Sequence, residues 1–333
     1  MHIIRGIKNV PPQLRGAAVV IGNFDGVHRG HQALMHTLHQ WATELGNLPT
    51  LVITFEPHPQ KVLNHASAPE RITGLRGKAR WIEQGGVDGL LVLRFSHPLA
   101  ALTPEQFVRQ ILVEALAVRA VLVGENFRFG AGGKGDCTTL CASGTALGFE
   151  VSCQSLLLDD NQVVSSTRIR ELVKQGQLAA VEPLLGRPFE IEGRISHGEQ
   201  RGRALGFPTA NLCLADFLYP PPGVYIVESQ IQGEWLPAVA NLGRNPTFGS
   251  QQLHLEVHLL AACGDLYHQV MRVRFLQRLR DEKRFADGAA LKRQIGLDVQ
   301  QAEKFFDQRR GERTASLSTV TTATVSGADT HGL

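Results

Sequence analysis

The chain has 333 residues, of which 43% are hydrophobic and 20% are charged, and its formal net charge is +3. This length and composition predict about two domains of an ordinary soluble protein. The small net charge, spread along the chain without a run of like charges, argues against a protein that binds nucleic acid or a membrane surface.

The sequence shows neither an export signal nor a membrane anchor. The apolar stretch within MHIIRGIKNVPPQLRG (1–16) is short and interrupted by charge, whereas a signal peptide needs a longer apolar core. No segment approaches the ~18 consecutive apolar residues of a membrane-spanning helix. We therefore expect a cytoplasmic protein.

The first half of the chain alternates between apolar runs and segments with helical spacing. The residues Leu34, Leu38, Trp41 and Leu45 recur at steps of 4, 3 and 4, as on one face of a helix. Another helix is expected to begin with TPEQ (103–106), which reads as a capping box with proline at the first position. The apolar runs indicate buried parallel strands at 17–24, 50–59, 89–95 and 120–127. Strands alternating with helices predict a doubly wound, Rossmann-like α/β sheet.

The hydrophobic pattern changes to a period of two near residue 186. Apolar and polar residues alternate in GRPFEIEGRISHG (186–198), as in a strand with one buried face. Further strands are expected at 223–231, 235–243, 252–260 and 269–276, and together they predict a small antiparallel β-barrel. A helix should follow at about 285–308, and residues 311–333, rich in Ser, Thr, Gly and Ala, should be disordered. We therefore place the domains at 1–185 and 186–310, followed by a tail at 311–333.

A cluster of polar residues follows the first buried strand, in VVIGNFDGVHRGHQ (19–32). A helix is expected to begin near Gly30, and the unpaired N–H groups at a helix N-terminus attract phosphate. Glycines let the backbone approach such a ligand. His28 and His31 could donate hydrogen bonds to phosphate oxygens, and a protonated histidine would stabilise charge on a transferring phosphoryl group. A loop with two solvated histidines and a metal site built on H-x-x-H stay open as alternatives.

A capped helix with two arginines is expected at VSSTRIRELV (164–173). Either Ser165 or Ser166 can cap it. Hydroxyl groups, helix N–H groups and Arg170 would then face one phosphate cluster. Without the first motif, an ordinary capped surface helix is the simpler interpretation.

A glycine-rich loop precedes PTAN in HGEQRGRALGFPTANL (197–212). Such a loop can expose consecutive N–H groups to phosphates. Thr209 offers a hydroxyl and Asn211 an amide oxygen, and both groups suit Mg²⁺. A bare PTAN is more often an ordinary turn that has no such function.

The predicted strand QLHLEVHLL (252–260) carries Glu256 on the face opposite its leucines, because side chains alternate along a strand. Phosphorylation of an alcohol calls for a carboxylate near the attacking hydroxyl. Taken alone, an exposed strand glutamate such as Glu256 is usually just a solvated residue. The cysteines add no clear site, because only Cys137 and Cys141 lie close together and no second pair matches them.

The polar cluster resembles the G-x-F-D-x-x-H-x-G-H signature of the nucleotidyltransferase fold. Its extended form, GNFDGVHRGH (22–31), resembles the N-terminal module of the bacterial bifunctional riboflavin kinase/FAD synthetase family. Three later segments are similar to that family in the same order: TFEPHP (54–59), ENFRFGAGGKGD (125–136) and VSSTRIRELV (164–173). Asn126 stands where many members carry aspartate.

The resemblance implies roles for individual residues of the first module. Asp25 and Asn126 would help to hold ATP or the acceptor, with Asn126 on the flavin side. The groups implied around the ATP phosphates are Gly22, Phe24, Gly30, His28, His31, Ser166, Thr167 and Arg170. The flavin would lie against Pro57, Pro59 and Phe129. A core role for Phe129 fits the sequence about as well, and Arg168, one residue from the family position, is given a lesser role.

The longer string G-x-x-x-G-R-x-x-G-F-P-T-A-N resembles the riboflavin kinase module of the same family. It implies that ATP is bound by Gly198, Gly202, Arg203 and Gly206. It also implies that Thr209 and Asn211 hold Mg²⁺, that Asn211 takes part in catalysis, and that Glu256 is the general base. The segments ANLGRNPTFG (240–249) and LRDEKRF (279–285) are similar to further family segments, and the second places Arg280 near the flavin.

The resemblance covers about residues 15–308 and implies an enzyme of two modules that uses Mg²⁺ and ATP. The C-terminal module would phosphorylate riboflavin to FMN, and the N-terminal module would adenylylate FMN to FAD and release pyrophosphate. Two alternatives stay open: an adenylyltransferase for another phosphate acceptor, and a flavin-binding regulator without catalysis. We expect no nucleic-acid or membrane partner, and leave self-association open.

Overall fold

The computed structural model describes residues 1–197, 201–244, 253–261, 264 and 266–325. Its internal contacts divide the chain into two compact units. The first unit contains Met1–Arg187 and Asp216–Pro220, and the second contains Pro188–Ala215 and Pro221–Leu333. Gly186 and Arg187 thus lie with the first unit, beyond the boundary placed from the sequence at residue 185.

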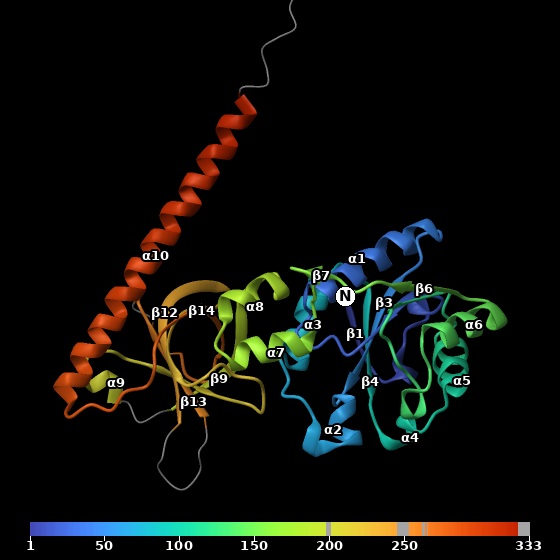
Figure 1. Cartoon of the computed structure of the whole chain (residues 1–333), viewed down its shortest axis with the longest axis horizontal. Helices are drawn as coiled ribbons and strands as arrows, with labels where there is room; N and C mark the ends of the chain where they lie inside the picture. The colour runs from blue at the N-terminus through green and yellow to red at the C-terminus, as the bar shows by residue number, and fades with distance from the viewer. Residues whose placement is uncertain (198–200, 245–252, 262–263, 265, 326–333) are drawn as a thin grey trace, which may run out of the picture. The chain divides into compact units, whose positions relative to one another are not determined.

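A six-stranded parallel sheet forms the centre of the first unit (Figure 1), as predicted. Its strand order is β1-β4-β3-β2-β5-β6, so the order along the chain reverses between β2 and β5. Ligands of such sheets bind outside the carboxyl ends of the strands at this switch point. The strands are β1 (His2–Arg5), β2 (Ala18–Ile21), β3 (Thr50–Glu56), β4 (Gly89–Arg94), β5 (Ala120–Gly124) and β6 (Glu150–Gln154). The edge strands β1 and β6 were not predicted, because neither is a continuous apolar run.

Helices cover both faces of this sheet, because successive strand residues point to opposite sides. On one face Val20 packs with Met35 and Leu38 of α1, and on the other Val19 packs in a cluster with Phe107 and Leu112. The helices are α1 (Arg29–Glu44), α2 (Pro59–Leu63), α3 (Leu75–Gln84), α4 (His97–Ala100), α5 (Pro104–Phe107) with a π-helical continuation (Val108–Ala115), α6 (Cys137–Leu147), α7 (Ser166–Lys174) and α8 (Leu178–Leu185). The predicted capping box between Thr103 and Gln106 is confirmed. A hairpin of β7 (Leu158–Asp159) and β8 (Gln162–Val163) precedes α7.

A closed antiparallel barrel of six strands forms the second unit, in the order β10-β13-β12-β11-β14-β9. This confirms the predicted barrel, although the short β10 inside the PTAN segment was not expected. The strands are β9 (Phe189–Ser196), β10 (Ala210–Cys213), β11 (Gly223–Ile231), β12 (Glu234–Arg244), β13 (Leu253–Leu259) and β14 (Val270–Arg280). The short helix α9 (Arg201–Ala204) lies between β9 and β10.

A long C-terminal helix, α10 (Gly288–Val325), packs on the barrel. Its Ala302 and Phe306 share an apolar cluster with Val224, Ile226 and Val239. The backbone stays helical beyond residue 311, where a disordered tail was expected, and this expectation is corrected through Val325. Extending an existing helix needs no new nucleation, so a weakly helical composition does not by itself end it. Residues 326–333 lie outside the described part.

None of the helices in the described ranges has both the length and the hydropathy of a membrane-spanning segment.

Candidate functional site

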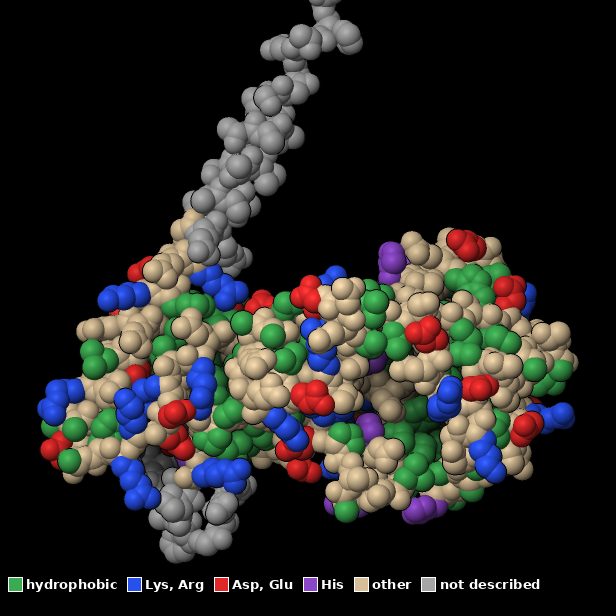
Figure 2. Space-filling view, viewed as in Figure 1, with side chains coloured by type: hydrophobic (Ala, Val, Ile, Leu, Met, Phe, Trp, Pro, Cys, Tyr) green, Lys and Arg blue, Asp and Glu red, His purple; other side chains and the backbone are tan. Residues whose placement is uncertain are grey.

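A cavity of about 770 Å³ opens in the first unit at the carboxyl ends of the strands. Figure 2 shows hydrophobic side chains around a hollow on this unit, with histidine near it. Nine residues expected from the sequence line the cavity: Gly22, Phe24, His28, Gly30, His31, Pro59, Asn126, Phe129 and Ser166. Aromatic residues that the sequence did not single out line it as well: Phe55, Phe95, Phe107 and Phe127. The cavity therefore combines a polar end with a broad aromatic wall.

The loop between β2 and α1 (residues 22–28, here the phosphate loop) has an unusual backbone. Phe24 and Val27 have positive φ angles of 48° and 41°, although both are non-glycine and fully buried. Such strain persists only where surrounding structure imposes it, and it gathers at functional sites. A Cβ at Gly30 would lie 3.2 Å from the His28 ring, so glycine allows the histidine to sit against the start of α1.

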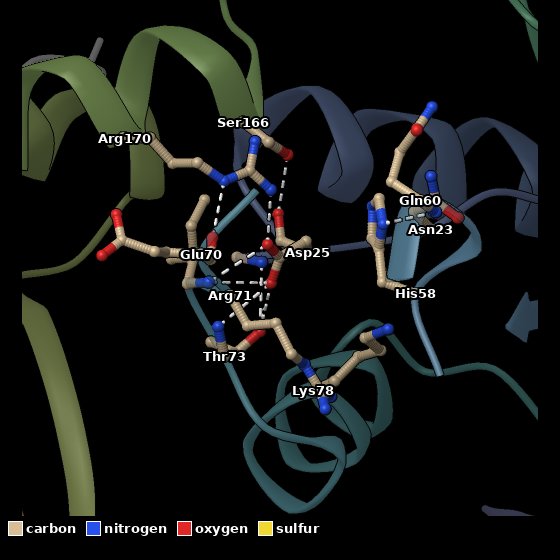
Figure 3. Close-up of polar contacts among 12 residues, drawn as sticks. Asn23, Asp25, His58, Gln60, Glu70, Arg71, Thr73, Lys78, Ser166 and Arg170 are labelled. Atoms are coloured by element: carbon tan, nitrogen blue, oxygen red, sulfur yellow. Dashed lines mark hydrogen bonds and ion pairs between the residues drawn. The ribbon is translucent and has the colours of Figure 1, made fainter. Parts of the chain in front are cut away.

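Groups outside the phosphate loop donate hydrogen bonds to several of its carbonyls, and Figure 3 shows the bond from Ser166 to Asp25. Thr54 Oγ1 donates to the Asn23 carbonyl at 3.1 Å, and Ser166 Oγ donates to the Asp25 carbonyl at 2.9 Å. Arg187 donates to the carbonyls of Gly26 and Val27. In a trans peptide the next N–H points opposite to the carbonyl. The N–H groups of Phe24 and His28 are therefore turned away from these anchors.

Asp25 and Arg170 bind one another. Arg170 Nη2 lies 2.6 Å from Asp25 Oδ2, and both side chains are largely buried. The same carboxylate accepts the backbone N–H groups of Ile72 and Thr73 at 3.0–3.1 Å. Neither Asp25 nor Arg170 lines the cavity. Their contacts hold the phosphate loop against α7 and the segment before α3, so both residues position the loop.

His28 and His31 stack on one another, with ring centroids 3.6 Å apart and planes 20° apart. Burial lowers the pKa of His28 to about 4, assisted by Arg187 and Arg170 and opposed by Asp25. Burial, with His28 next in order, also holds the pKa of His31 well below its usual value. Both Nδ1 atoms are buried and have no partner among the described residues. At pH 7 the pair is neutral, so in the free protein it offers N–H groups rather than the positive charge considered from the sequence.

Two further groups beside this loop, the half-buried His58 and the buried Lys78, were not proposed from the sequence. His58 accepts the backbone N–H of Gln60 at 3.2 Å through Nδ1, and burial lowers its pKa to about 4. Lys78 Nζ lies 3.3 Å from Thr54 Oγ1. Burial lowers the pKa of Lys78 to about 8, against the opposing effect of Asp25 and Glu56. His58 sits inside the TFEPHP motif and could have been noticed there, whereas nothing local marks Lys78.

The start of α7 combines several of the expected residues. Ser165 caps the helix by accepting the N–H of Arg168 at 3.2 Å, while Ser166 bonds the phosphate loop as described above. Thr167 is exposed and does not line the cavity. Arg168 ties the β7–β8 hairpin by donating to the Asp159 carbonyl at 3.2 Å and pairing with its carboxylate. Of these residues, Ser165 and Ser166 face the cavity.

The predicted flavin-side residues lie in different environments. Phe129 is buried in the core, stacks on Phe127 at 5.5 Å between centroids, and also lines the cavity. Asn126 and Pro59 line the cavity, and Pro57, which follows a cis peptide bond, does not.

Arg187→Ala is expected to lower FMN adenylylation, the activity that the resemblance implies for the first unit, about 10- to 100-fold. A small displacement of positioned groups has effects of that size. Arg187 is buried, donates to three carbonyls at 2.6–3.2 Å, and lies 3.9 Å from the centroid of the Trp81 ring. Arg187→Lys should be intermediate, since one ammonium cannot reproduce the guanidinium geometry. Exposed Arg109→Ala is the control. Equal activity of the Arg187→Ala and Arg109→Ala chains would contradict this role.

Acid is expected to destabilise the first unit through its buried histidines. The unfolded chain binds a proton at His28 near pH 6.5, but the folded chain binds it only near pH 4. Stability is therefore complete above pH 6.5 and falls as the pH drops towards 4, by up to about 3 kcal/mol for such a residue. Urea unfolding, followed by Trp41 and Trp81 fluorescence in a Trp235→Phe background, should show a shallower pH dependence for His28→Asn. Exposed His36→Asn should retain the original slope, and equal slopes for both variants would refute the assignment.

A second cavity, of about 340 Å³, lies in the barrel unit. Glu256 of β13 is in register with Asn211 of β10 on one side and Asn241 of β12 on the other. All three line the cavity, as does Thr209. The neighbouring Leu255 and Val257 are buried in the barrel, so the predicted facing of this strand is confirmed. Glu256 therefore lies between two asparagine residues at the cavity. Asn241 was not proposed from the sequence and is a further candidate residue of this site.

The glycine-rich loop closes around the PTAN segment. A Cβ at Gly202 would collide with the Phe207 carbonyl and stand 3.3 Å from Thr209 Oγ1, so only glycine permits this approach. Gly206 has a φ of 90°, which also favours glycine. Gly202 lines the cavity, whereas Gly206 and the exposed Arg203 do not. Gly198 lies outside the described residues.

Arg280, expected near the flavin, is engaged by α10. Its Nη2 and Nε lie 2.7 and 3.0 Å from the Asp298 carboxylate, which also accepts from Gln294. Asp298 is buried, and both ends of the pair line the cavity. The ion pair therefore joins α10 to the end of β14 at the edge of the second site.

Comparison with known proteins gives two family matches. The sequence model described as FAD synthetase matches residues 10–168, and the one described as riboflavin kinase matches residues 185–306. The chain is 43% identical over 309 residues to the bifunctional riboflavin kinase/FMN adenylyltransferase of Escherichia coli K12, covering 92% of this chain and 98% of that protein. It is 43% identical to the Pseudomonas fluorescens protein of the same name, covering 90% and 96% of the two chains.

One solved structure is similar to the chain over nearly its whole length. It is described as a macrolide-efflux protein from Streptococcus pneumoniae and has a TM-score of 0.80 at 30% identity. The match covers 91% of this chain and 99% of that one.

Proposed function

The chain belongs to the family of bifunctional riboflavin kinase/FMN adenylyltransferases, and we propose from this which residues carry each of its two reactions. One reaction phosphorylates riboflavin with ATP to give FMN, and the other adenylylates FMN with ATP to give FAD and pyrophosphate. We assign adenylylation to the first unit and phosphorylation to the barrel unit. The alternatives of another acceptor or of a non-catalytic regulator gain no support from any observed feature.

Adenylylation is assigned to the 770 Å³ cavity, and the anchored phosphate loop carries this assignment. The loop turns the N–H groups of Phe24 and His28 away from its anchors, and both residues line the cavity. A phosphate oxygen of FMN attacks the α-phosphorus of ATP, the bond to the α–β bridging oxygen breaks, and pyrophosphate leaves. No protein nucleophile is needed, so the enzyme contributes position and hydrogen bonds to the phosphate oxygens. His28 and His31 supply side-chain N–H donors at the start of α1.

The aromatic wall of the same cavity suits the flavin ring. Phe127 and Phe129 are already stacked, and Phe107 lies 5.7 Å from Phe129 between centroids. A planar isoalloxazine gains from offset or edge contacts with such rings. Asn126 and Pro59 border the same space and would contact the flavin there.

Phosphorylation is assigned to the 340 Å³ cavity, and the position of Glu256 between two amides carries this assignment. Glu256 takes the proton of the terminal ribityl hydroxyl as that oxygen attacks the γ-phosphorus of ATP. The bond from the γ-phosphorus to the β–γ bridging oxygen breaks, and ADP leaves. Asn211 and Asn241 flank the Glu256 carboxylate, keep its environment polar and fix its orientation.

Mg²⁺ fits the donor set of this second cavity. Thr209 and Asn211, which line the cavity, offer a hydroxyl and an amide oxygen, and the Glu256 carboxylate lines the same cavity. A set with a single carboxylate suits Mg²⁺, which takes part of its shell from substrate phosphates and water. When bound, the ion neutralises charge on the phosphates. Thr209 and Asn211 are the residues that we propose to hold it.

The function is tested by incubating the full chain with riboflavin, ATP and Mg²⁺ and separating the flavins by chromatography. FMN should appear first and FAD after it. Replacing riboflavin by FMN should give FAD directly, with one pyrophosphate per FAD. Unchanged riboflavin in the first reaction, or unchanged FMN in the second, would refute the corresponding assignment. We place both reactions in the cytoplasm, because both consume ATP.

A further inference from the structure

Gln154 carries a buried polar atom that the described residues leave unpaired. It is the last residue of β6 and pairs in register with Gly124, the last residue of β5. Its backbone carbonyl accepts the N–H of Glu125 at 2.9 Å. Its side chain lines the first cavity, where the amide oxygen is buried and has no hydrogen-bond partner among the described residues. A buried acceptor without a partner is costly, so a bound molecule that brings a donor here gains binding energy.

The wall beside Gln154 is lined mainly by aliphatic side chains. Leu156 and Leu157 follow it and line the cavity together with Val163 and Val164. The N–H of Leu156, a nearby backbone donor, is already directed to Glu125 Oε1 at 3.3 Å. A heterocyclic ring with polar atoms on its edge suits this combination of apolar sides and one amide.

The substrates carry two rings, the adenine of ATP and the isoalloxazine of FMN. The position of this wall next to α1 indicates which of them Gln154 would contact. The Val164 N–H donates to the Leu157 carbonyl at 2.8 Å, which joins the two sides of the wall. The Val164 carbonyl lies 3.5 Å from where a Cβ at Gly30 would stand, so the wall meets the start of α1. That is where the proposed phosphate site lies. A nucleoside attached to those phosphates can then lie along this wall, while the aromatic wall is left for the flavin.

We infer that Gln154 recognises the amino edge of the adenine ring of ATP, with its amide oxygen accepting from the exocyclic N6–H and its amide nitrogen donating to a ring nitrogen. A primary amide matches this edge because donor and acceptor lie side by side on both partners. This role rests on the proposed adenylylation in the first unit. It makes Gln154 a determinant of base specificity.

The test compares ATP with 6-deamino-ATP (purine riboside triphosphate), which lacks the N6 amine, in FMN adenylylation by the full chain. For Gln154→Leu, the KM for ATP should rise by about tenfold or more, since a lost hydrogen bond costs about that much and both contacts of the amide are removed. The KM for 6-deamino-ATP should rise less, since that nucleotide has no amine to lose and only its contact with the amide nitrogen is removed. Gln154→Glu, which keeps the acceptor, should fall between the Gln154→Leu and original chains.

Gln162→Leu, an exposed glutamine on β8, is the matched control and should leave both KM values unchanged. Urea unfolding followed by Trp41 and Trp81 fluorescence in a Trp235→Phe background reports whether the first unit of each variant is folded. An increase in the KM for FMN instead of ATP would overturn the inference by assigning the amide to the flavin. Equal loss with both nucleotides, or no change with either, would overturn it as well. FAD formation by the unsubstituted chain tests the underlying function separately.

Discussion

Glu256→Gln is expected to lower riboflavin phosphorylation by roughly 10²–10⁴-fold, the usual contribution of a positioned general base. The substitution keeps the side-chain shape and its place between Asn211 and Asn241, but an amide oxygen cannot take up the proton of the ribityl hydroxyl. The loss should appear in kcat, because the residue acts on the reacting hydroxyl rather than on substrate affinity. Initial rates of FMN formation, measured by chromatography with saturating ATP, give this number.

The same Glu256→Gln preparation should convert added FMN to FAD at the original rate, since Glu256 lines only the barrel cavity of the two described here. Glu234→Gln, on an exposed residue at the start of β12, is the matched control and should retain both activities. If Glu256→Gln phosphorylates riboflavin normally, another group is the base. If it stays folded but loses both activities, the assignment of the reactions to separate units is wrong.

Joint replacement of His28 and His31 by alanine should reduce FMN adenylylation by at least about 10³-fold. Each ring supplies a donor at the proposed phosphate site, and removing one such preorganised donor typically costs about 10²–10³-fold. Because both histidines are neutral in the free protein, the loss arises from missing hydrogen bonds and packing, not from a missing positive charge. FAD formation from FMN and ATP measures it.

His36→Ala with His39→Ala provides the matched control, because these two histidines lie on the exposed face of the same helix. The control should adenylylate FMN normally. The His28/His31 variant should still phosphorylate riboflavin, which shows that its barrel unit is intact, and Trp41 and Trp81 fluorescence in a Trp235→Phe background should show that its first unit is folded. Normal adenylylation by that variant would remove the histidines from the proposed site.

Local patterns predicted the architecture well where one element contains all the information. The buried runs became β2, β3, β4 and β5, and the TPEQ signal became a complete capping box. The facing of Glu256 followed from alternation along one strand. The edge strands β1 and β6 were missed because their half-exposed faces dilute the apolar pattern.

Local patterns could not predict contacts between residues that are distant in sequence. Arg170 was expected at the ATP phosphates, yet its guanidinium pairs with Asp25, which is 145 residues away. Arg280 was expected beside the flavin, and it pairs with Asp298 of α10. A basic residue near a phosphate motif can serve the ligand or the scaffold, and only the three-dimensional arrangement shows which carboxylate lies within reach. The anchoring by Arg187 was missed for the same reason.

The anchored carbonyls of the phosphate loop have a consequence for genetics. The binding groups that they orient belong to the main chain, so almost any side-chain replacement at Phe24 or His28 leaves the N–H in place. Only proline, or an ester in place of the amide, deletes such a donor. Mutational scans would therefore report the anchors, such as Thr54, Ser166 and Arg187, and at Phe24 and His28 they would report the side chain and not the main-chain donor.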